Sequence, residues 1–453
     1  MNSPFVSLES MKRLATEKTR GVRFSGDIAI LGTPVDIEDF TIPNRIAIQP
    51  LEAADSDGQG KPTERTRGRY IDYARGCAGL IWFEACAIDF PEARSHDSML
   101  VISEENVETY RSIVEDVKEV SRESVKAVGS EGRALLVLQL SHAGRYRVHR
   151  DERSPATSFR FPEVDEAFGI TGDVGRVITD SELEDIRDAF VRASELGFEA
   201  GFDAVDVKAC HGYLLNDLLA GADREGRYGG ETFDDRTKFQ LETMKAVVEE
   251  TGGMVTSRMN AYDGFPPPYG FGSSSEVSPE GLASFDPSEP AELIRRMRGL
   301  GVELINISLG NPYFSQYLTR PFDTKMPGQK ESPFHPIKGV ERHFEIVDAL
   351  KRRVPGMLFL GAGYSWLREH GVNAAAHNIE QSRADLAGWG RLAIANPGFP
   401  REILEDGSLN PGKVCVTCSG CSRLLRAGMH VGCVVQNPEA YRESMRELSQ
   451  RGK

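Results

Sequence analysis

The chain has 453 residues, 40% hydrophobic and 27% charged, a composition typical of globular proteins large enough for a full core. Asp and Glu (68) outnumber Lys and Arg (54), and the net charge of -14 argues against a broad nucleic-acid surface and against anionic membranes. No apolar run is long enough to span a bilayer, and residues 1–20 lack the apolar segment of a secretory signal. We therefore expect a cytoplasmic protein that binds a small molecule, either alone or as a homo-oligomer.

Apolar stretches that predict strands alternate with helical patterns along the chain. The strands are expected at 44–50, 79–83, 135–140, 204–210, 254–260, 304–309, 358–361 and 386–390. Helical patterns lie between them, at 63–75, 104–128, 183–196, 233–250, 290–300, 340–353 and 366–380. Ser181 and Glu184 have the spacing of a capping box at the third of these helices.

This order of elements predicts an α/β fold, a (β/α)8 TIM barrel. A doubly wound open sheet is the alternative, but it would carry a glycine fingerprint near its first strand, and none is present. We expect the barrel, with an N-terminal lead, over residues 1–410, and a small C-terminal extension over 411–453. Two loops rich in Pro, Gly and Ser, 264–280 and 311–338, follow strands and are expected to shape a site at the C-terminal face of the barrel.

Polar groups gather at or just after the ends of the predicted strands, where barrel enzymes build their sites. They are Glu52, Gln139, His142, Lys208, His211, Tyr213, Arg258, Gly361, Ala362, Gly363, Gly390 and Arg391. The last five follow strands seven and eight, where glycines let backbone N–H groups approach an anion and an arginine supplies charge. A phosphate-bearing cofactor inside the barrel mouth is the prediction.

Four of the seven cysteines form a cluster near the C-terminus. Cys415, Cys418 and Cys421 are each separated by two residues, and Cys433 follows after eleven. Thiols at this spacing indicate a metal site, and spacing alone leaves iron–sulfur and zinc open. Cys77, Cys86 and Cys210 stand alone, so a disulfide framework is not expected.

Several motifs together resemble the Old Yellow Enzyme family of FMN oxidoreductases. They are Asn44-Arg45-Ile46 with Pro50, the run from Gln139 to Arg145, His211-Gly212-Tyr213-Leu214-Leu215, Tyr228-Gly229-Gly230 followed by Arg236, and Gly390-Arg391 through Ala395-Asn396-Pro397. They occur in the family's order over nearly the whole chain. The clustered cysteines extend the resemblance to the iron–sulfur branch that includes 2,4-dienoyl-CoA reductase and trimethylamine dehydrogenase.

The resemblance implies that FMN lies across the barrel mouth. Gln139 would bond the pyrimidine ring, and Arg258 would lie near the flavin N1 and C2 oxygen, where a cation stabilises the charge of the reduced ring. Pro50, Leu51, Glu52 and Ala85 would border the reactive side of the ring. Tyr213 falls at the position of the family's proton donor.

The chain departs from the family pattern at the substrate position. Lys208 and His211 stand where many members have a His–Asn or His–His pair, and a lysine makes a substrate carboxylate or oxyanion more plausible. The alternative is that Lys208 pairs with an acid such as Asp206 or Glu84.

Two further departures concern the cofactors. Glu52 stands near the flavin where relatives have a small or thiol side chain, so it is protonated, points away, or lowers the flavin potential. Relatives with a known cluster usually have three residues, rather than two, between the second and third cysteines.

An FMN-dependent ene-reductase is the leading hypothesis, with hydride passing from flavin N5 to an activated C=C bond and Tyr213 as acid. NAD(P)H reduces the flavin directly, or an electron-transfer partner does so through a [4Fe–4S] cluster, which the flavin favours over zinc. An amine dehydrogenase or demethylase, with Tyr262, Phe265, Tyr313 and Phe314 as an aromatic cage, is one alternative. A zinc-stapled lyase without flavin, using Lys208 as a Schiff-base nucleophile, is another.

Overall fold

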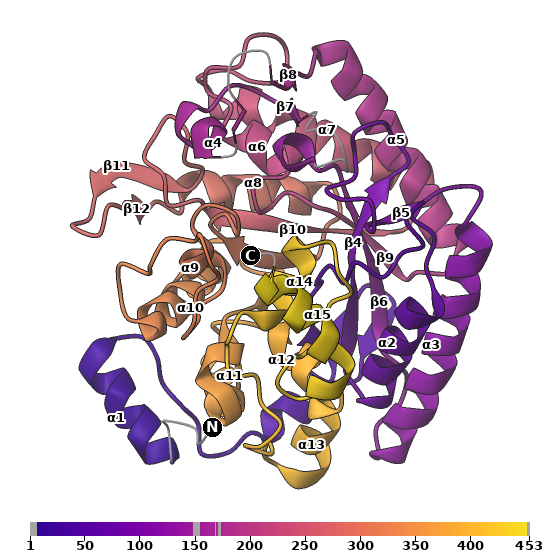
Figure 1. Cartoon of the computed structure of the whole chain (residues 1–453), viewed down its shortest axis with the longest axis vertical. Helices are drawn as coiled ribbons and strands as arrows, with labels where there is room; N and C mark the ends of the chain where they lie inside the picture. Colours follow the sequence, from indigo (N-terminus) through magenta and orange to yellow (C-terminus); the bar gives the residue numbers. More distant parts are fainter. Residues whose placement is uncertain (1–6, 148–154, 168, 171–173, 451–453) are drawn as a thin grey trace.

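The computed structural model describes residues 7–147, 155–167, 169–170 and 174–450 of the chain. Eight parallel strands form its centre, in the order in which they were predicted (Figure 1). They are β3 (Ile46–Ile48), β4 (Leu80–Ile88), β6 (Leu135–Ser141), β9 (Ala204–Val207), β10 (Met254–Tyr262), β13 (Leu304–Leu309), β14 (Leu358–Gly361) and β15 (Leu386–Trp389). A short strand, β5 (Leu100–Ile102), pairs with the far end of β4.

The sheet closes on itself because β3 pairs with the last strand as well as with the next one. Ala387 of β15 lies opposite Ile46, and Leu80 of β4 lies opposite Ala47. An open sheet has no such closing pair, so the doubly wound alternative is wrong and the TIM barrel is confirmed. Strands β6 and β13 are buried along their whole length, as a filled barrel requires, with apolar residues such as Leu135 and Leu304 at their starts.

Helices surround the barrel at the predicted places. They are α2 (Glu64–Arg75), α3 (Val107–Ala127), α5 (Asp180–Glu199), α7 (Phe233–Thr251), α8 (Ser288–Gly299), α10 (Pro336–Arg353) and α11 (Gly371–Glu380). The predicted capping box is wrong in its residues: α5 begins earlier, so Thr179 and Glu182 make the reciprocal bonds instead of Ser181 and Glu184. A 3-10 segment, η3 (Tyr364–His370), precedes α11.

Smaller elements complete the described chain. The helices are α1 (Leu8–Lys18), α4 (Pro162–Ala167), α6 (Leu214–Leu219), α9 (Gln316–Thr319), α12 (Arg391–Ala395), α13 (Phe399–Asp406), α14 (Gly420–Arg426) and α15 (Pro438–Gln450), with the 3-10 turns η1 (Ala29–Gly32) and η2 (Gly144–Tyr146). The strands are β1 (Val35–Ile37), β2 (Phe40–Ile42), β7 (Ala156–Thr157), β8 (Arg176–Val177), β11 (Ser273–Val277) and β12 (Ala283–Phe285).

An N-terminal hairpin of β1 and β2 covers one end of the barrel. Its inward residues, Val35, Ile37 and Ile42, pack with the first residues of the barrel strands, such as Leu80 and Leu135. This apolar cluster seals the N-terminal end, so only the opposite end offers space for a site.

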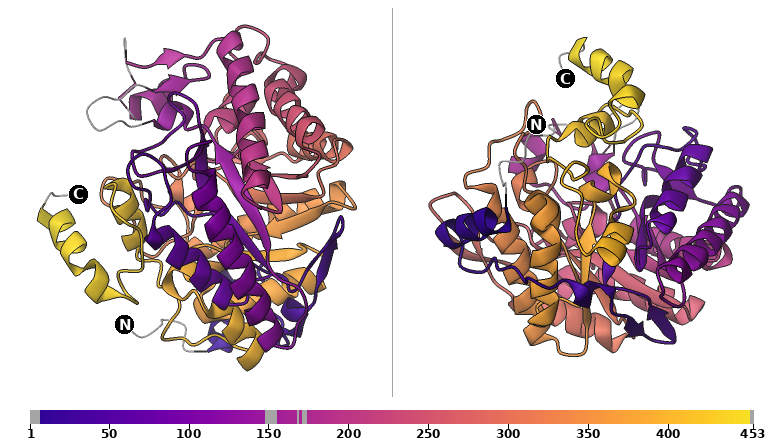
Figure 2. Two further views of the ribbon diagram at one scale, coloured as in Figure 1. Left: turned by 90° about the vertical axis from the view of Figure 1, so that its right-hand side faces the viewer. Right: turned by 90° about the horizontal axis from the view of Figure 1, so that it is seen from below.

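The C-terminal extension lies against that opposite end. In Figure 1, α14 and α15 lie in front of the barrel, and in Figure 2 α15 projects from it. Val431 donates its N–H to the carbonyl of Ala53 and accepts from Arg69, and His430 contacts the carbonyl of Ala54. The loop after β3 therefore holds the extension in place.

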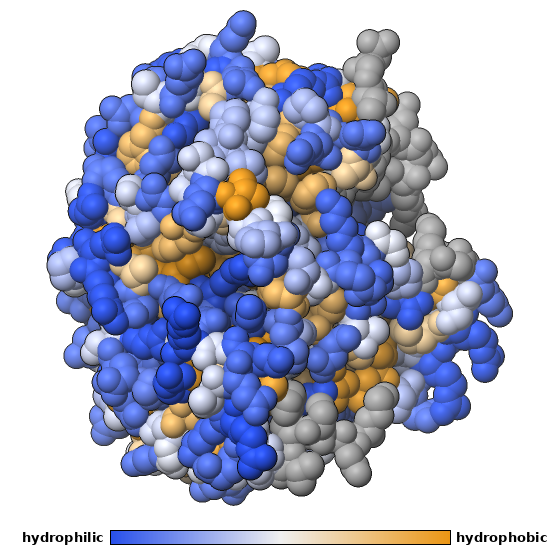
Figure 3. Space-filling model, turned by 90° about the vertical axis from the view of Figure 1, so that its left-hand side faces the viewer, coloured by the Kyte–Doolittle hydropathy of each residue, from blue (hydrophilic) through white to orange (hydrophobic). Residues whose placement is uncertain are grey.

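The surface shows no broad apolar face in the described part of the chain. The large exposed apolar residues there are four separate valines, Val174, Val177, Val277 and Val435, and the face in Figure 3 is mostly hydrophilic with small, separate apolar areas. Among the described helices, none is both long and apolar enough to cross a membrane. A homo-oligomer stays a prediction.

A buried charge network fixes the loops around the barrel mouth. The Arg145 guanidinium donates to Asp217 at 3.0 and 2.9 Å, pairs with Asp165, and is almost wholly buried. It thereby ties η2 to α4 and α6, the short helix that follows Tyr213.

We expect Arg145→Leu to lower the free energy of unfolding by about 3–5 kcal/mol, because it leaves buried carboxylates without a counter-charge. Urea unfolding followed by circular dichroism measures the change. The exposed pair between Arg192 and Glu104 provides the control, since Arg192→Leu should leave the unfolding midpoint nearly unchanged. Equal midpoints for both variants would contradict the structural role of Arg145.

Candidate active site

A cavity opens at the C-terminal ends of the barrel strands. It contains about 1140 Å³ of space free of protein atoms, part of it open to solvent. The predicted residues that line it are Pro50, Leu51, Glu52, Ala85, Gln139, Lys208, His211, Tyr213, Arg258, Ala362, Gly363, Gly390 and Arg391. These predicted residues come from seven of the eight strands, and Pro312 and Tyr313, after β13, represent the eighth.

Gly361 is the exception among the predicted cofactor residues, because it does not line the cavity. It is the last residue of β14, where it pairs with Ala387 of β15. A side chain at this position would lie 3.0 Å from the Tyr364 hydroxyl, away from the cavity. Its role is to let β14 and η3 pack closely, and only Ala362 and Gly363 reach the site.

Asp206 of β9 orients the side-chain amide of Gln139, which is predicted to bond the flavin. Its carboxylate accepts from Gln139 at 2.6 Å, from the indole of Trp82 at 2.8 Å and from the backbone N–H of Arg258 at 2.7 Å. Burial raises the pKa of Asp206 to about 6 although these donors lower it. Since the Gln139 amide nitrogen is engaged, its carbonyl oxygen is left for a ligand.

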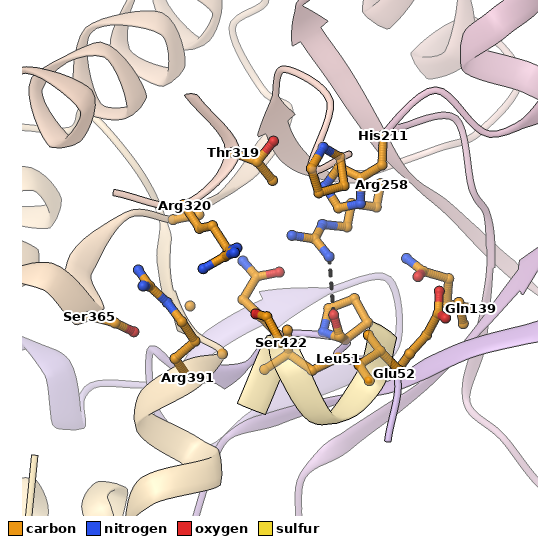
Figure 4. Close-up of a pocket in the computed structure, with 18 of the residues that line it drawn as sticks. Leu51, Glu52, Gln139, His211, Arg258, Thr319, Arg320, Ser365, Arg391 and Ser422 are labelled. Atoms are coloured by element: carbon orange, nitrogen blue, oxygen red, sulfur yellow. Dashed lines mark hydrogen bonds between the residues drawn. The ribbon is translucent and has the colours of Figure 1, made fainter. Parts of the chain in front are cut away.

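Arg258 points into the middle of the cavity from β10. One of its nitrogens donates to the Pro50 carbonyl at 3.2 Å, shown as the dashed line in Figure 4. Burial lowers the pKa of Arg258, and its Nε has no hydrogen-bond partner. The guanidinium is therefore fixed next to Pro50 and Leu51, with bonding capacity left for a ligand.

Two further arginines face the same space at the other end of the cavity. Figure 4 shows Arg320 and Arg391 near one another, from the loop before α10 and from α12. Arg391 donates to the Pro321 carbonyl at 2.7 Å, and Arg320 donates to the Ser419 hydroxyl at 3.0 Å. Burial, and then the charge of Arg391, lower the pKa of Arg320 to about 10. Two close cations of this kind favour a phosphate.

The cationic groups are not balanced by acids of the protein. Within the described ranges, Arg258, Arg320, Arg391 and Arg426 form no ion pair with a carboxylate. Buried nitrogens of Gln49, Arg258 and Arg391 have no hydrogen-bond partner. Such atoms need acceptors, since an unpaired buried donor is costly. FMN carries acceptors on its ring and phosphate, so the residues present fit this cofactor.

A separate group of residues surrounds Glu52 on the other side of the cavity. Its carboxylate accepts from the Tyr213 hydroxyl at 2.8 Å and lies 3.7 Å from the Lys208 ammonium. Lys208 also lies 3.4 Å from the centre of the Tyr213 ring. The alternative prediction was that Lys208 pairs with an acid such as Asp206 or Glu84. Lys208 does pair with an acid, but the acid is Glu52.

The state of Glu52 follows from its neighbours. Burial alone would raise the pKa of Glu52, but the hydrogen bond from His96 and the charge of Lys208 outweigh it and lower the pKa to about 2. Glu52 is ionised, so the protonated option is wrong. Its carboxylate contacts Tyr213 and His96, and an orientation away from the flavin stays a prediction. An effect on the flavin potential stays a prediction.

Tyr213 is held rigidly by the turn before α6. Gly212 has φ +73°, and a side chain there would lie 2.7 Å from the Tyr146 hydroxyl, so only glycine fits. The Tyr213 hydroxyl also lies 3.2 Å from that of Tyr313. Burial, and then the charge of Glu52, raise the pKa of Tyr213 well above its usual value.

His211 precedes this turn and has its own partner. Its Nε2 lies 2.7 Å from the Ser308 hydroxyl at the end of β13. Burial, followed by the charges of Arg258 and Lys208, lowers the pKa of His211 well below its usual value, so the imidazole is neutral. His142, also predicted, is buried and donates no group to the cavity; its Nδ1 accepts from the Gly144 N–H.

Several residues of the cavity were not predicted. They include Gln49, Tyr313, Thr319, Arg320, Met326, Ser365, Ser422, Leu425 and Arg426, with Tyr313 foreseen only as part of an aromatic cage. The loop 311–338 shapes the cavity as expected, whereas none of 264–280 lines it, because that segment leads into the β11 and β12 pair. Of the four aromatic residues proposed as a cage, only Tyr313 lines the cavity; Tyr262, Phe265 and Phe314 do not.

The cysteine cluster lies beside the cavity without forming a ligand set. Cys415, Cys418, Cys421 and Cys433 are free, partly exposed thiols. Burial raises the pKa of Cys415, with Cys421 and Cys433 close enough to add to the effect. Yet among the described residues, no group of three or more His, Cys, Asp or Glu side chains is arranged to hold a metal. A metal site at these four thiols therefore stays a prediction.

Comparisons with known proteins agree with this site. A family model described as "NADH:flavin oxidoreductase / NADH oxidase family" matches residues 31–271, more than half of the chain. An NADPH dehydrogenase of Bacillus pumilus (strain SAFR-032) is 28% identical over 382 residues, 83% of this chain and 94% of that protein. A putative 12-oxophytodienoate reductase 2 of Oryza sativa subsp. japonica is 27% identical over 83% of this chain and 88% of its own.

A solved structure shares the fold. A 2-naphthoyl-CoA reductase in complex with 2-naphthoyl-CoA has a TM-score of 0.68 and 18% identity, over 90% of this chain and 57% of that one. The resemblance to flavin oxidoreductases is confirmed, and with it an enzyme that uses FMN and NAD(P)H. The chain belongs to the NADH:flavin oxidoreductase / NADH oxidase family.

Proposed function

We propose that the protein is an FMN-dependent ene-reductase that acts on a C=C bond conjugated to a carbonyl group. The observation that carries the proposal is the Tyr213 hydroxyl, a buried acid held in the same cavity as the flavin-side groups Gln139 and Arg258. In this reaction a proton must reach the α-carbon while the β-carbon receives hydride, and Tyr213 is the group placed to give that proton.

The cofactor would bind on the side of the cavity that holds Arg258, Arg320 and Arg391. When bound, FMN supplies the hydride at N5 after taking one from NAD(P)H. Gln139 and Arg258 would bind the pyrimidine part of the ring, and Arg320 and Arg391 would bind the phosphate. Pro50, Leu51 and Ala85 would lie along the ring.

The substrate oxygen would be held by His211 and Lys208. His211 is neutral and oriented by Ser308, so it can donate a hydrogen bond without adding charge. Lys208 brings a positive charge that Glu52 already balances, so the oxygen of an ordinary carbonyl suits this pair. An additional anionic group on the substrate would suit Arg426, which has no acidic partner in the described chain.

The names of similar proteins support a reductase. One relative is called an NADPH dehydrogenase and another a putative 12-oxophytodienoate reductase. The amine dehydrogenase alternative is weaker, because Tyr313 alone of the four expected cage residues lines the cavity, and Arg426 already lies 5.2 Å from the centre of its ring. The lyase without flavin is set aside because the chain belongs to a flavin family.

A [4Fe–4S] cluster on Cys415, Cys418, Cys421 and Cys433 also stays our proposal, with zinc as the alternative and an electron-transfer partner as a corollary. The support is the spacing of the four thiols and their place next to the cavity, since α14 carries Cys421 and also Ser422 and Leu425, which line it. The reaction above does not depend on the cluster.

Replacement of Arg391, which is proposed to bind the FMN phosphate, should weaken FMN binding. We expect Arg391→Met to raise the dissociation constant of FMN roughly 10-fold to 100-fold, because a hydrogen bond to a charged group contributes about 1.5–3 kcal/mol. Flavin fluorescence during titration of the apoprotein measures it. Arg352→Met, at an exposed position of α10, is the control and should bind FMN as the unaltered protein does. Equal affinity in both variants would remove Arg391 from the phosphate site.

Tyr213→Phe should separate the two half-reactions. We expect reoxidation of the reduced flavin by an enone to slow about 10²-fold to 10⁴-fold, the usual contribution of a general acid. Reduction by NAD(P)H should change little, because it needs no proton from Tyr213. Stopped-flow absorbance of the flavin follows both steps, and Tyr269→Phe, outside the cavity, is the control. An equal loss in both half-reactions would contradict the role of Tyr213 as acid.

Metal content decides the role of the four cysteines. Protein purified without oxygen should contain four iron and four sulfide ions per chain beside FMN, and Cys421→Ser should lose them. One zinc per chain would favour the structural alternative, and neither metal would refute both. Cys77→Ser is the matched control, because Cys77 is a solitary buried thiol far along the chain from the other four.

A further inference from the structure

Glu52 is the centre of a hydrogen-bonded chain that leads away from the cavity. One of its oxygens accepts from Tyr213 at 2.8 Å, and the other lies 3.3 Å from the His96 Nε2 and 3.3 Å from the Ser95 hydroxyl. These four side chains come from three separate places: the loop after β3, the loop after β4 and the turn before α6. A carboxylate with a different partner on each oxygen can pass a proton between those partners.

The charge of Glu52 creates a difficulty for an acid at Tyr213. When Tyr213 gives up its proton, a negative charge arises on an oxygen 2.8 Å from an ionised carboxylate. Two like charges at this distance in a buried site are strongly unfavourable. Lys208 compensates only one of them, because the cluster of Glu52, Lys208 and Tyr213 then holds one cation and two anions. The proton transfer therefore requires that Glu52 become neutral.

His96 is the group placed to neutralise Glu52. Its Nε2 lies 3.3 Å from Glu52 Oε2, and its side chain is 20% exposed, more than the 12% of Glu52. The other groups around Glu52 cannot supply a proton easily: Ser95 is a weak acid, and Lys208 is needed as the cation of the cluster. An imidazole can both accept and donate a proton at a ring nitrogen.

We propose that His96 and Glu52 form a proton relay that supplies Tyr213 from solvent, with His96 as proton entry and Glu52 as the link. The inference rests on the proposed ene-reductase function, and it goes beyond that function because it assigns two further residues to the proton path.

In each step of the relay, one bond to the proton breaks as another forms. The Tyr213 O–H bond breaks as the C–H bond at the substrate α-carbon forms. The proton of the His96 imidazolium leaves Nε2 and binds Glu52 Oε2, so the carboxyl group is neutral while the Tyr213 oxygen carries the charge. A half-turn of the carboxyl group about its Cγ–Cδ bond then presents this proton to the Tyr213 oxygen. Glu52 returns to its ionised form, and His96 takes a new proton from water at Nε2, because its Nδ1 is buried without a partner.

The test is a double-mutant cycle on single-turnover reoxidation of the FMN-loaded, reduced protein by cyclohexenone. His96→Gln should slow this step about 10-fold or more in the unaltered background, which is within the range of a proton-transfer contribution. In a Glu52→Gln background the same change should alter the rate less than 2-fold, because the link is already absent. Reoxidation by ferricyanide, which needs no proton at carbon, measures any effect on the flavin itself.

Chemical rescue separates a relay from a structural role. Imidazole added to His96→Ala should restore most of the lost rate with cyclohexenone, whereas imidazole cannot repair a misfolded loop. His377→Gln, a partly buried histidine of α11 away from the cavity, is the control and should behave as the unaltered protein.

The outcomes are distinguishable. If unaltered reduced protein reacts with ferricyanide but with no enone, both the proposed function and the relay are wrong. If it reacts with cyclohexenone and His96→Gln is as fast, or slows the step equally in both Glu52 backgrounds, the relay alone is wrong. The relay is supported if His96→Gln slows the step only where Glu52 is present and imidazole restores the rate of His96→Ala.

Discussion

Charge burial at the barrel mouth is the constraint on which the site depends. Glu52, Lys208 and Tyr213 lie together out of water, and each is tolerable there only because of the others. A buried ion pair is costly when one partner is removed, so a change at any of the three would disturb the other two. The same coupling makes the acid, the carboxylate and the ammonium one functional unit rather than three independent residues.

The barrel brings this unit together from distant parts of the sequence. Glu52 follows β3, Lys208 and Tyr213 follow β9, and Tyr313 follows β13. In a closed parallel barrel every strand ends at the same face, so polar residues after each strand must meet there. The extension adds a wall to that face, because Leu425 and Arg426 of α14 line the cavity and Arg426 donates to the Pro312 carbonyl.

Much of this arrangement was predictable, and the failures have physical reasons. The alternation of apolar strands and helices determines the barrel, and motifs at strand ends identified thirteen residues that line the cavity. The partner of Lys208 was not predictable, because the choice among Asp206, Glu84 and Glu52 depends on where side chains point. Asp206 is engaged by Gln139 and Trp82, and Glu84 by the Ala53 N–H. Arg320 was missed because it lies in a loop, and Arg426 because no sequence pattern indicates that the short helix α14 of the extension lies over the barrel mouth.

The electrostatics of the cavity contrast with those of the chain. The sequence carries a net charge of -14, yet the cavity holds the guanidinium groups of Arg258, Arg320, Arg391 and Arg426, with the charge of Glu52 cancelled by Lys208. Since fields are strongest where water is excluded, local cations decide what binds. An FMN phosphate would account for two of them, and the reduced ring for a third. Arg426 is the remaining one, and under the proposed function it favours a substrate that carries an acidic group besides the activated double bond.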